Sequence, residues 1–273
     1  HFFSYIENKV KDTIRRFDLI KPTEKIAVAV SGGKDSQTVL SILHTLYGSR
    51  VSAIAIDEGI PKYRDQTLED LRQFCKPRNI PYKIYSFKQA FGKPLSQLVT
   101  QGASPCRSCG VLRRNLLNTN AKNFDKLATG HNLDDECQNI IMNLLKGSLF
   151  LLAKLGPMSG IAERQQFTRR IKPLYLITEK ETTAYAFLKQ FPVRFNECPN
   201  AEGTFRSKVR DGLNELESKK PKTKRAIIDN FLNILPILKK TYENSPIPRQ
   251  CTQCKSPSTG SICKACTTVN FYA

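Results

Sequence analysis

The chain has 273 residues, 40% hydrophobic and 25% charged, which is the composition of a globular protein long enough to bury a substantial core. No stretch approaches about 18 consecutive apolar residues, so a membrane span is excluded, as are wholly disordered and collagen-like chains. The formal net charge of +19 favours a polyanionic partner, with nucleic acid as the first candidate and a generally basic surface as the plainer alternative.

Strand and helix patterns alternate over the first half of the chain. The predicted strands are residues 25–30, 51–56, 81–87 and 126–129. The predicted helices are residues 2–14, 36–47, 63–76, 112–118 and 133–146. Such alternation predicts an α/β protein whose parallel sheet carries helices on both faces.

The second half of the chain is predicted to be mainly helical. Helices are expected at residues 177–190, 204–218 and 221–240, and Pro236 should kink or split the last of them. Residues 243–250 resemble a linker, and residues 251–273 form a Cys-rich tail.

A glycine-rich loop, Ser31-Gly32-Gly33-Lys34-Asp35-Ser36, follows the first predicted strand and opens a predicted helix. Glycines let the backbone approach a ligand closely, and the N–H groups at a helix start suit a phosphate. The loop is not a Walker A motif, because Val28 stands where its first glycine belongs and Asp35 replaces the Ser/Thr after the lysine. The plainer alternative is an ordinary Gly-Gly turn.

A second loop, Gly130-His131-Asn132-Leu133-Asp134-Asp135-Glu136, connects the fourth predicted strand to a helix. Acidic residues here are typical of plain helix N-terminal capping. Their position beyond the carboxyl end of a parallel strand also fits a nucleotide against Gly130 and an aspartate near ribose or Mg²⁺. His131 is either a base or, at least as plausibly, a structural hydrogen-bonding residue.

Six of the nine cysteines lie in C-x-x-C pairs. The tail pairs, Cys251/Cys254 and Cys263/Cys266, have the spacing of a structural zinc site, with disulfides or no site as the alternatives. The pair Cys106/Cys109 is predicted on a loop before a helix and suits zinc, a redox disulfide or an iron–sulfur cluster. The solitary Cys75 and Cys137 are expected to be core residues. Since the opening segment HFFSYIENKVKDTIRRF has no signal-peptide pattern, a cytoplasmic location is expected, where clustered cysteines indicate metal or redox sites.

Four motifs together, SGGKDS, PCRSCG with its Arg-containing helix, GHNLDDE and ECPN, resemble the tRNA 2-thiouridine synthetases of the TtuA and NcsA type. That family belongs to the PP-loop ATP pyrophosphatases and includes the cytoplasmic tRNA 2-thiolation proteins. The tail CTQCKSPSTGSICKAC is similar to the family's C-terminal zinc ribbon. The resemblance therefore implies a Rossmann-like PP-loop fold followed by a helical region and a small zinc ribbon.

The resemblance also implies the site residues. Cys106, Cys109 and Cys198 would hold a [4Fe-4S] cluster, with Cys106, Cys198, Arg113 and Asp135 in catalytic roles and Asp135 on the Mg²⁺ side. Some relatives have lysine where Arg113 stands, which leaves its role open. The residues implied for ATP are Ala29, Val30, Ser31, Gly32, Gly33, Lys34, Asp35 and Ser36, with the adenosine near Ala55 and Gly130.

Four regions are expected from the resemblance. Residues 1–20 would be an N-terminal helix that remains from a truncated zinc ribbon, whose last ligand matches His1; His1 would bind zinc only where that ribbon is present. Residues 21–200 would be the PP-loop catalytic domain, residues 201–242 a basic helical region, and residues 251–273 the C-terminal ribbon.

The implied activity is ATP-dependent tRNA 2-thiolation by a tRNA-uridine 2-sulfurtransferase that forms AMP and pyrophosphate. ATP would adenylate the C2 oxygen of a uridine, and a cluster-bound sulfide would then displace AMP. The implied partners are tRNA and a ubiquitin-like sulfur carrier protein or a sulfide donor, with no membrane; a homodimer is compatible. Two alternatives remain open: another PP-loop tRNA-modifying ligase of the cytidine thiolase or lysidine synthetase type, and a non-catalytic, zinc-dependent RNA-binding protein.

Residues 204–225 hold eight Lys/Arg against three Asp/Glu. This window is either a contact surface for the phosphate backbone of tRNA or a solvated helix face. Lys219, Lys220, Lys222 and Lys224 are its candidate contact residues.

Overall fold

The computed structural model describes residues 1–98, 105–162, 167–195, 198–200, 203–246 and 248–271. Its main sheet is parallel throughout, with strand order β3-β2-β1-β4-β5. The strands are β1 (Ile26–Ala29), β2 (Val51–Asp57), β3 (Tyr82–Ser86), β4 (Lys126–Thr129) and β5 (Arg169–Ile171). The predicted α/β class is confirmed. The sequence did not predict β5, because three residues that begin Arg-Arg show no apolar run.

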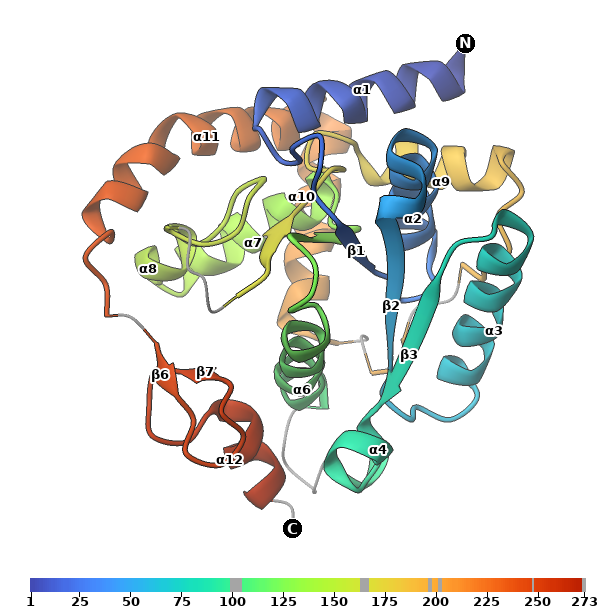
Figure 1. Cartoon of the computed structure of the whole chain (residues 1–273). Coiled ribbons are helices and arrows are strands. Elements are labelled where there is room, and N and C mark those ends of the chain that lie inside the picture. The colour runs from blue at the N-terminus through green and yellow to red at the C-terminus, as the bar shows by residue number, and fades with distance from the viewer. Residues whose placement is uncertain (99–104, 163–166, 196–197, 201–202, 247, 272–273) are drawn as a thin grey trace.

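Helices cover both faces of this sheet (Figure 1). The long helices are α1 (Phe2–Arg16), α2 (Lys34–Tyr47), α3 (Tyr63–Cys75), α6 (Pro105–Asn120), α7 (Leu133–Leu145), α9 (Glu179–Leu188), α10 (Phe205–Lys219) and α11 (Thr223–Thr241). The shorter elements are η1 (Gly48–Arg50), η2 (Lys76–Arg78), α4 (Phe87–Phe91), α5 (Leu95–Leu98), α8 (Leu149–Leu152), β6 (Arg249–Gln250), β7 (Pro257–Ser258) and α12 (Lys264–Phe271). None of the helices in the described ranges is both long and apolar enough to cross a membrane.

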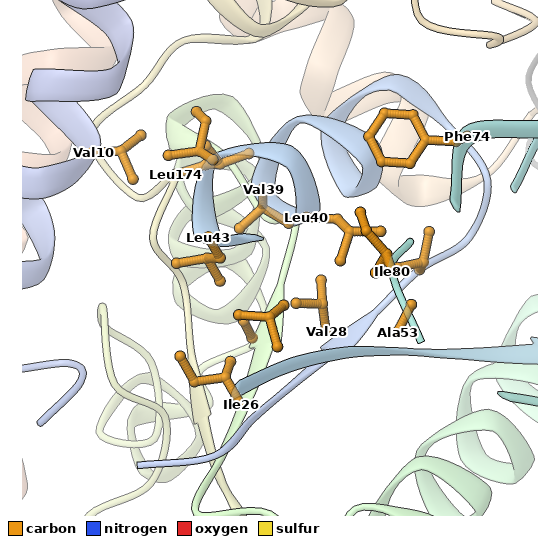
Figure 2. Close-up of a cluster of buried hydrophobic side chains, with 14 of the residues drawn as sticks. Val10, Ile26, Val28, Val39, Leu40, Leu43, Ala53, Phe74, Ile80 and Leu174 are labelled. Atoms are coloured by element: carbon orange, nitrogen blue, oxygen red, sulfur yellow. The ribbon is translucent and has the colours of Figure 1, made fainter. Parts of the chain in front are cut away.

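The alternation of side chains along β1 explains the two layers of helices. Ile26 and Val28 face a core formed with α1, α2 and α3, where Figure 2 shows them beneath Val39 and Leu43. Ala27, between them, faces the opposite core with α6. Each fully buried aliphatic side chain of this kind contributes about 1.5–3 kcal/mol, so the two cores fix the sheet between its helices.

A third apolar cluster joins α7 to the C-terminal helices α10 and α11. Ile228, Phe231 and Leu235 of α11 are buried in it. The expected splitting of this helix at Pro236 is wrong, because α11 continues through the proline to Thr241. The packing of the preceding residues against α7 holds the helix despite the hydrogen bond that proline cannot donate.

The Cys-rich tail packs against α6, beside the parallel sheet and away from α1 (Figure 1). β6 and β7 form an antiparallel ribbon, and α12 follows. Cys251 and Cys263 are buried in the same apolar cluster as Leu112 of α6, and Asn115 of α6 donates a hydrogen bond to Ser256 Oγ at 3.3 Å. The tail is therefore joined to the helix that carries the Cys106/Cys109 pair.

Candidate functional site

The SGGKDS loop lies at the carboxyl end of β1, the central strand of the sheet. The chain adds β2 and β3 on one side of β1, and then β4 and β5 on the other. Open parallel sheets bind ligands at such a point. Helix α2 begins at Lys34 with Gly33 as its N-cap, so the first N–H groups of the helix have no helical partner. Ser36 Oγ accepts a hydrogen bond from Ser31 N at 3.2 Å and donates to Gly33 O at 2.8 Å, which fixes the loop. This is a structure able to surround a phosphate.

Gly32 is required by both conformation and space. Its φ is +90°, and a Cβ there would lie 2.1 Å from the carbonyl oxygen of Thr67 in α3. Gly130 is required by space alone, because its Cβ would lie 2.8 Å from Ser36 N. The structure therefore places Gly130 directly against the start of α2.

Polar side chains from three elements surround Asp35. Its Oδ1 accepts hydrogen bonds from Asn132 Nδ2 at 3.2 Å and from the hydroxyl of Thr182, and its Oδ2 accepts from Lys34 Nζ at 2.8 Å. Lys34 Nζ also lies 3.2 Å from Glu179 Oε1. Burial works against the ammonium, but the carboxylates of Asp35 and Glu179 outweigh it and raise the pKa of Lys34. The lysine is therefore held charged beside the phosphate loop.

Asp135 has the capping role and also faces the phosphate loop. It exchanges capping-box hydrogen bonds with Asn132, with Asp135 Oδ2 accepting from Asn132 N at 3.2 Å. Burial and the negative charge of Asp35 raise the pKa of Asp135 to about 6. The Asp135 carboxyl, which faces the Asp35 carboxylate, forms with it a candidate divalent-cation site.

Two residues at this edge had no sequence prediction. Arg206 of α10 lies 3.7 Å from Asp135 Oδ1 and donates to Gln138 at 2.9 Å. Glu179 starts α9 and lies beside Lys34. Both come from the part of the chain after Ser148, where helical periodicity carries no signal of what a helix end faces. His131 is exposed, and its Nδ1 lies 2.8 Å from Thr129 Oγ1.

The three cysteines of the implied cluster site are brought together by α6 and the segment around Cys198. The prediction that Cys106 and Cys109 lie on a loop is wrong: both belong to the first turns of α6, which begins at Pro105 because proline is favoured at the first position of a helix. Cys106 Sγ lies 3.0 Å from Asn200 O. Within the ECPN motif, Glu197 lies outside the described residues.

Burial raises the pKa of the Cys106 and Cys109 thiols, and Cys198 acts in the same direction. Arg113 lowers both pKa values but does not outweigh burial. Cys198 packs against the apolar cluster that contains Cys109, so the ECPN segment reaches the start of α6. Arg113 Nη2 donates to Cys109 Sγ at 3.2 Å and Arg113 Nε lies 3.3 Å from Glu58 Oε1.

The tail brings its four cysteines much closer together. Cys251 Sγ lies 3.9 Å from Cys266 Sγ, and Cys254 Sγ lies 3.5 Å from Cys263 Sγ. All four sulfurs lie within 4.8 Å of one another, so this group can hold a metal ion. In the described residues, Cys106, Cys109 and Cys198 do not meet that limit. Sulfurs that bind separate irons of a cluster need not be as close as sulfurs on one ion.

The remaining predicted residues are located as follows. Ala55 is buried in β2, Val30 follows β1 with its N–H bonded to Ile54 O, and Cys75 and Cys137 are core residues, as predicted. His1 is exposed at the start of α1 and has no capping hydrogen bond from its side chain. Lys224 is not a surface residue, because its ammonium is buried against Asp134 and Asn214.

These features define a PP-loop nucleotide-binding protein. Residues 4–216 match the PP-loop domain family, so the chain belongs to that family.

Among curated relatives, a tRNA-5-methyluridine(54) 2-sulfurtransferase of Pyrococcus horikoshii is 36% identical over 97% of this chain and 85% of its own length. Cytoplasmic tRNA 2-thiolation protein 1 of Laccaria bicolor is 32% identical over 97% of this chain and 77% of its own. The solved U34-tRNA thiolase NcsA of Methanococcus maripaludis, with its [4Fe-4S] cluster, is 34% identical, with a TM-score of 0.82, and covers 99% of this chain and 88% of that one. Within the PP-loop family, the chain therefore belongs to the tRNA 2-thiolation proteins.

Proposed function

We propose that the protein is an ATP-dependent tRNA-uridine 2-sulfurtransferase that forms AMP and pyrophosphate. The observation that carries this proposal is the pairing of two sites in one chain, a phosphate loop at the start of α2 and a cysteine pair at the start of α6, with Cys198 packed against the same apolar cluster as Cys109. The first can bind ATP, and the second can handle sulfur. Arg113 and Glu58 lie between them.

The loop from Ser31 to Ser36 would hold the phosphates of ATP. Unpaired N–H groups at the start of α2 and the charged Lys34 stabilise negative charge as pyrophosphate leaves. Asp35 and Asp135 would hold Mg²⁺, and the adenosine would lie near Ala29, Ala55 and Gly130. These assignments follow from the position of the residues at one edge of the sheet.

The reaction has two displacements. The C2 oxygen of uridine forms a bond to the α-phosphorus while the bond to pyrophosphate breaks. A sulfur nucleophile then bonds to C2, and AMP leaves with the former carbonyl oxygen. Arg113, which donates to Cys109 Sγ, would place positive charge where the sulfur nucleophile meets the adenylate.

Cys106, Cys109 and Cys198 fit a [4Fe-4S] cluster, since Cys106 Sγ contacts Asn200 O of the ECPN segment, Cys198 packs against the apolar cluster of Cys109, and the Arg113 guanidinium donates to Cys109 Sγ. When bound with three protein ligands, such a cluster supplies an iron with a free position for sulfide. The alternative is a disulfide between two of these cysteines or a persulfide on one of them. Iron and sulfide analysis of protein purified without oxygen distinguishes the two.

We infer that the tail metal is zinc. A tetrahedral site with Zn–S bonds of about 2.3 Å places its sulfurs about 3.8 Å apart. The observed separations of 3.9 and 3.5 Å agree with this geometry. Four sulfur ligands close the site to substrate, so its role is structural.

The tRNA would approach over α10 and the start of α11. Lys220 and Lys222 are exposed there, whereas Lys219 is paired with Glu215 at 2.6 Å. Binding of tRNA can be measured at several salt concentrations, and log K plotted against log salt concentration. Reversing Lys220 and Lys222 to Glu should reduce the slope of that plot by about one for each phosphate that is no longer neutralised. An unchanged slope would show that this is only a solvated helix face.

Further assignments complete the proposal. The sulfur donor would be a ubiquitin-like carrier protein or free sulfide, and the enzyme would act in the cytoplasm. These assignments are compatible with a homodimer. Its regions would be residues 1–20, 21–200, 201–242 and 251–273, and His1 would bind zinc only as part of an N-terminal ribbon.

The test is anaerobic reconstitution followed by incubation with tRNA, ATP and a sulfur-35 donor. We expect labelled 2-thiouridine, with mass spectrometry of tRNA fragments to show whether position 34 or 54 carries it. Cys198→Ser should abolish labelling and retain ATP binding, while the neighbouring control Ser108→Ala should behave as wild type. Lysine incorporation without iron would instead support a lysidine synthetase, and the absence of tRNA-dependent pyrophosphate release would support an RNA-binding protein. Normal labelling by Cys198→Ser would refute the cysteine assignment.

A further inference from the structure

Glu58 is a buried acid between two arginines. It follows the last residue of β2 and is 5% exposed. Its Oε2 lies 2.9 Å from Arg64 Nε, and its Oε1 lies 3.3 Å from Arg113 Nε. A buried carboxylate is tolerated when such partners compensate its charge. The two arginines belong to different helices, so Glu58 connects α3 with α6.

Arg64 connects Glu58 to the phosphate loop. It is the second residue of α3 and is 3% exposed. Its guanidinium donates hydrogen bonds to the carbonyl oxygens of Ser31 and Ile56 and to Thr67 Oγ1 at 3.0 Å. These acceptors belong to the loop, to β2 and to α3, so one side chain fixes the three elements together.

Arg113 completes the connection at the cysteine end. Its side chain is 44% exposed, and it donates to Cys109 Sγ through Nη2 while Glu58 Oε1 forms an ion pair with it, 3.3 Å from Nε. Because a guanidinium is planar and rigid, fixing Nε also fixes the direction of Nη2. A continuous set of contacts therefore runs from the Ser31 carbonyl through Arg64, Glu58 and Arg113 to the Cys109 sulfur.

We propose that Glu58 and Arg64 are positioning residues, which hold Arg113 at Cys109 and fix this arrangement relative to the phosphate loop. The proposal rests on the proposed function, because it assigns the geometry between the ATP site and the cysteine site. Both side chains are buried and have protein groups as partners. They act by keeping the two sites in a fixed relation, so that the adenylated base and the sulfur meet without rearrangement.

The first test measures Arg113 in the cluster-free protein. Nitrogen-15 NMR should show a slowly exchanging Arg113 Nε–H signal, identified by its absence in Arg113→Lys. Glu58→Gln should broaden that signal or make it exchange faster, whereas the matched control Glu69→Gln, an exposed acid of α3, should leave it unchanged. A signal that Glu58→Gln does not alter would overturn the proposal. This measurement needs neither iron nor tRNA, so it is independent of the proposed function.

The second test is a double-mutant cycle with Glu58→Gln and Arg113→Gln in reconstituted protein. Loss of a residue that orients a metal ligand typically costs about 10–100-fold. We expect Glu58→Gln to lower the thiolation kcat by about tenfold and to accelerate iron loss to a chelator. In the Arg113→Gln background, the same change should have less than about a twofold effect, because its target is absent. Effects that multiply would show a merely structural role and overturn the proposal.

The third test separates Arg64 from Glu58. Arg64→Lys keeps the charge but loses the fork of donors, so we expect weaker binding of a non-hydrolysable ATP analogue as well as a lower kcat. Glu58→Gln should leave analogue affinity within about twofold, since Arg64 keeps its three other acceptors. Normal analogue binding and kcat in a folded Arg64→Lys would overturn the role of Arg64. If wild-type protein takes up no iron and makes no 2-thiouridine, the proposed function fails, and the NMR test still decides the positioning proposal.

Discussion

Replacing Gly130 with alanine tests how the sheet holds the phosphate loop. The added Cβ would lie 2.8 Å from Ser36 N and 2.9 Å from the carbonyl carbon of Asp35, about 0.6 Å short of ordinary contact at 3.4 Å. Both neighbours are backbone atoms at the start of α2 and cannot rotate away. Overpacking of this kind costs about 1–3 kcal/mol. For a protein of this size, that cost corresponds to a melting temperature lower by about 2–10 °C.

The displaced helix should also affect catalysis. A shift approaching 1 Å can reduce a rate by about 100-fold, so we expect at least about a tenfold loss of kcat together with weaker ATP binding. Gly33→Ala is the matched control for folding. Gly33 has φ −82°, and its Cβ would lie 3.6 Å from Ser31 Oγ, so the fold accommodates it.

The two variants should therefore separate stability from binding. Gly33→Ala should keep the wild-type melting temperature but weaken ATP binding, because a Cβ at the helix start blocks close approach of a phosphate. Differential scanning calorimetry and isothermal titration with ATP measure the two effects. Unchanged melting and ATP affinity in Gly130→Ala would refute the assignment of Gly130 to the contact between β4 and α2.

Three further predictions concern buried charge, pH and metal. Lys172→Met should destabilise the protein by about 3–5 kcal/mol in urea unfolding, because it leaves the fully buried Glu136 without its ion-pair partner at 2.7 Å. Adding Glu136→Gln to this variant should recover much of the lost stability. A double variant that shows the full loss would contradict this account. Burial alone would raise the pKa of Glu181, but the hydrogen bonds from Lys9 and Thr178 lower it below 4.5, so this group stabilises the fold above that pH and the contribution is lost on acidification. The free energy of unfolding should therefore fall less on acidification in Glu181→Gln than in wild type. The same dependence on acidic pH in both proteins would count against this account. Cys254→Ser should release the tail metal and increase hydrogen exchange in residues 249–271 while ATP binding persists, and an unchanged metal content would exclude Cys254 as a ligand.

The alternating first half of the chain made the fold predictable. β1 and β2 are short, largely apolar runs, each followed by a segment of helical periodicity, so these strands and the PP-loop position follow from the pattern. β5 has no such run, and its strand conformation depends on pairing with β4. Pro236 does not split α11 for a related reason, since tertiary packing of the helix outweighs a local preference.

The residues of the site also differ in how well the sequence identifies them. The glycines and cysteines are identifiable because their chemistry restricts them to few roles. Glu58, Arg64 and Arg206 are not, since an isolated Glu or Arg is usually a solvated surface residue. Their burial and contacts arise only when β2, α3, α6 and α10 meet. The position of Glu58 two residues after a predicted parallel strand was the one available signal.

The packing of the tail on α6 sets a strict condition on insertions. Asn115, Leu112 and the tail fix the rotation of α6 from its middle, and the cysteines occupy its first turns. One extra residue between Cys109 and Leu112 would rotate both cysteines by about 100° relative to the anchored part of the helix. An extra residue before Pro105 would leave that rotation unchanged. The rotation of the two cysteines about the helix axis therefore depends on the number of residues between them and the anchor, and not on the length of the chain ahead of the helix.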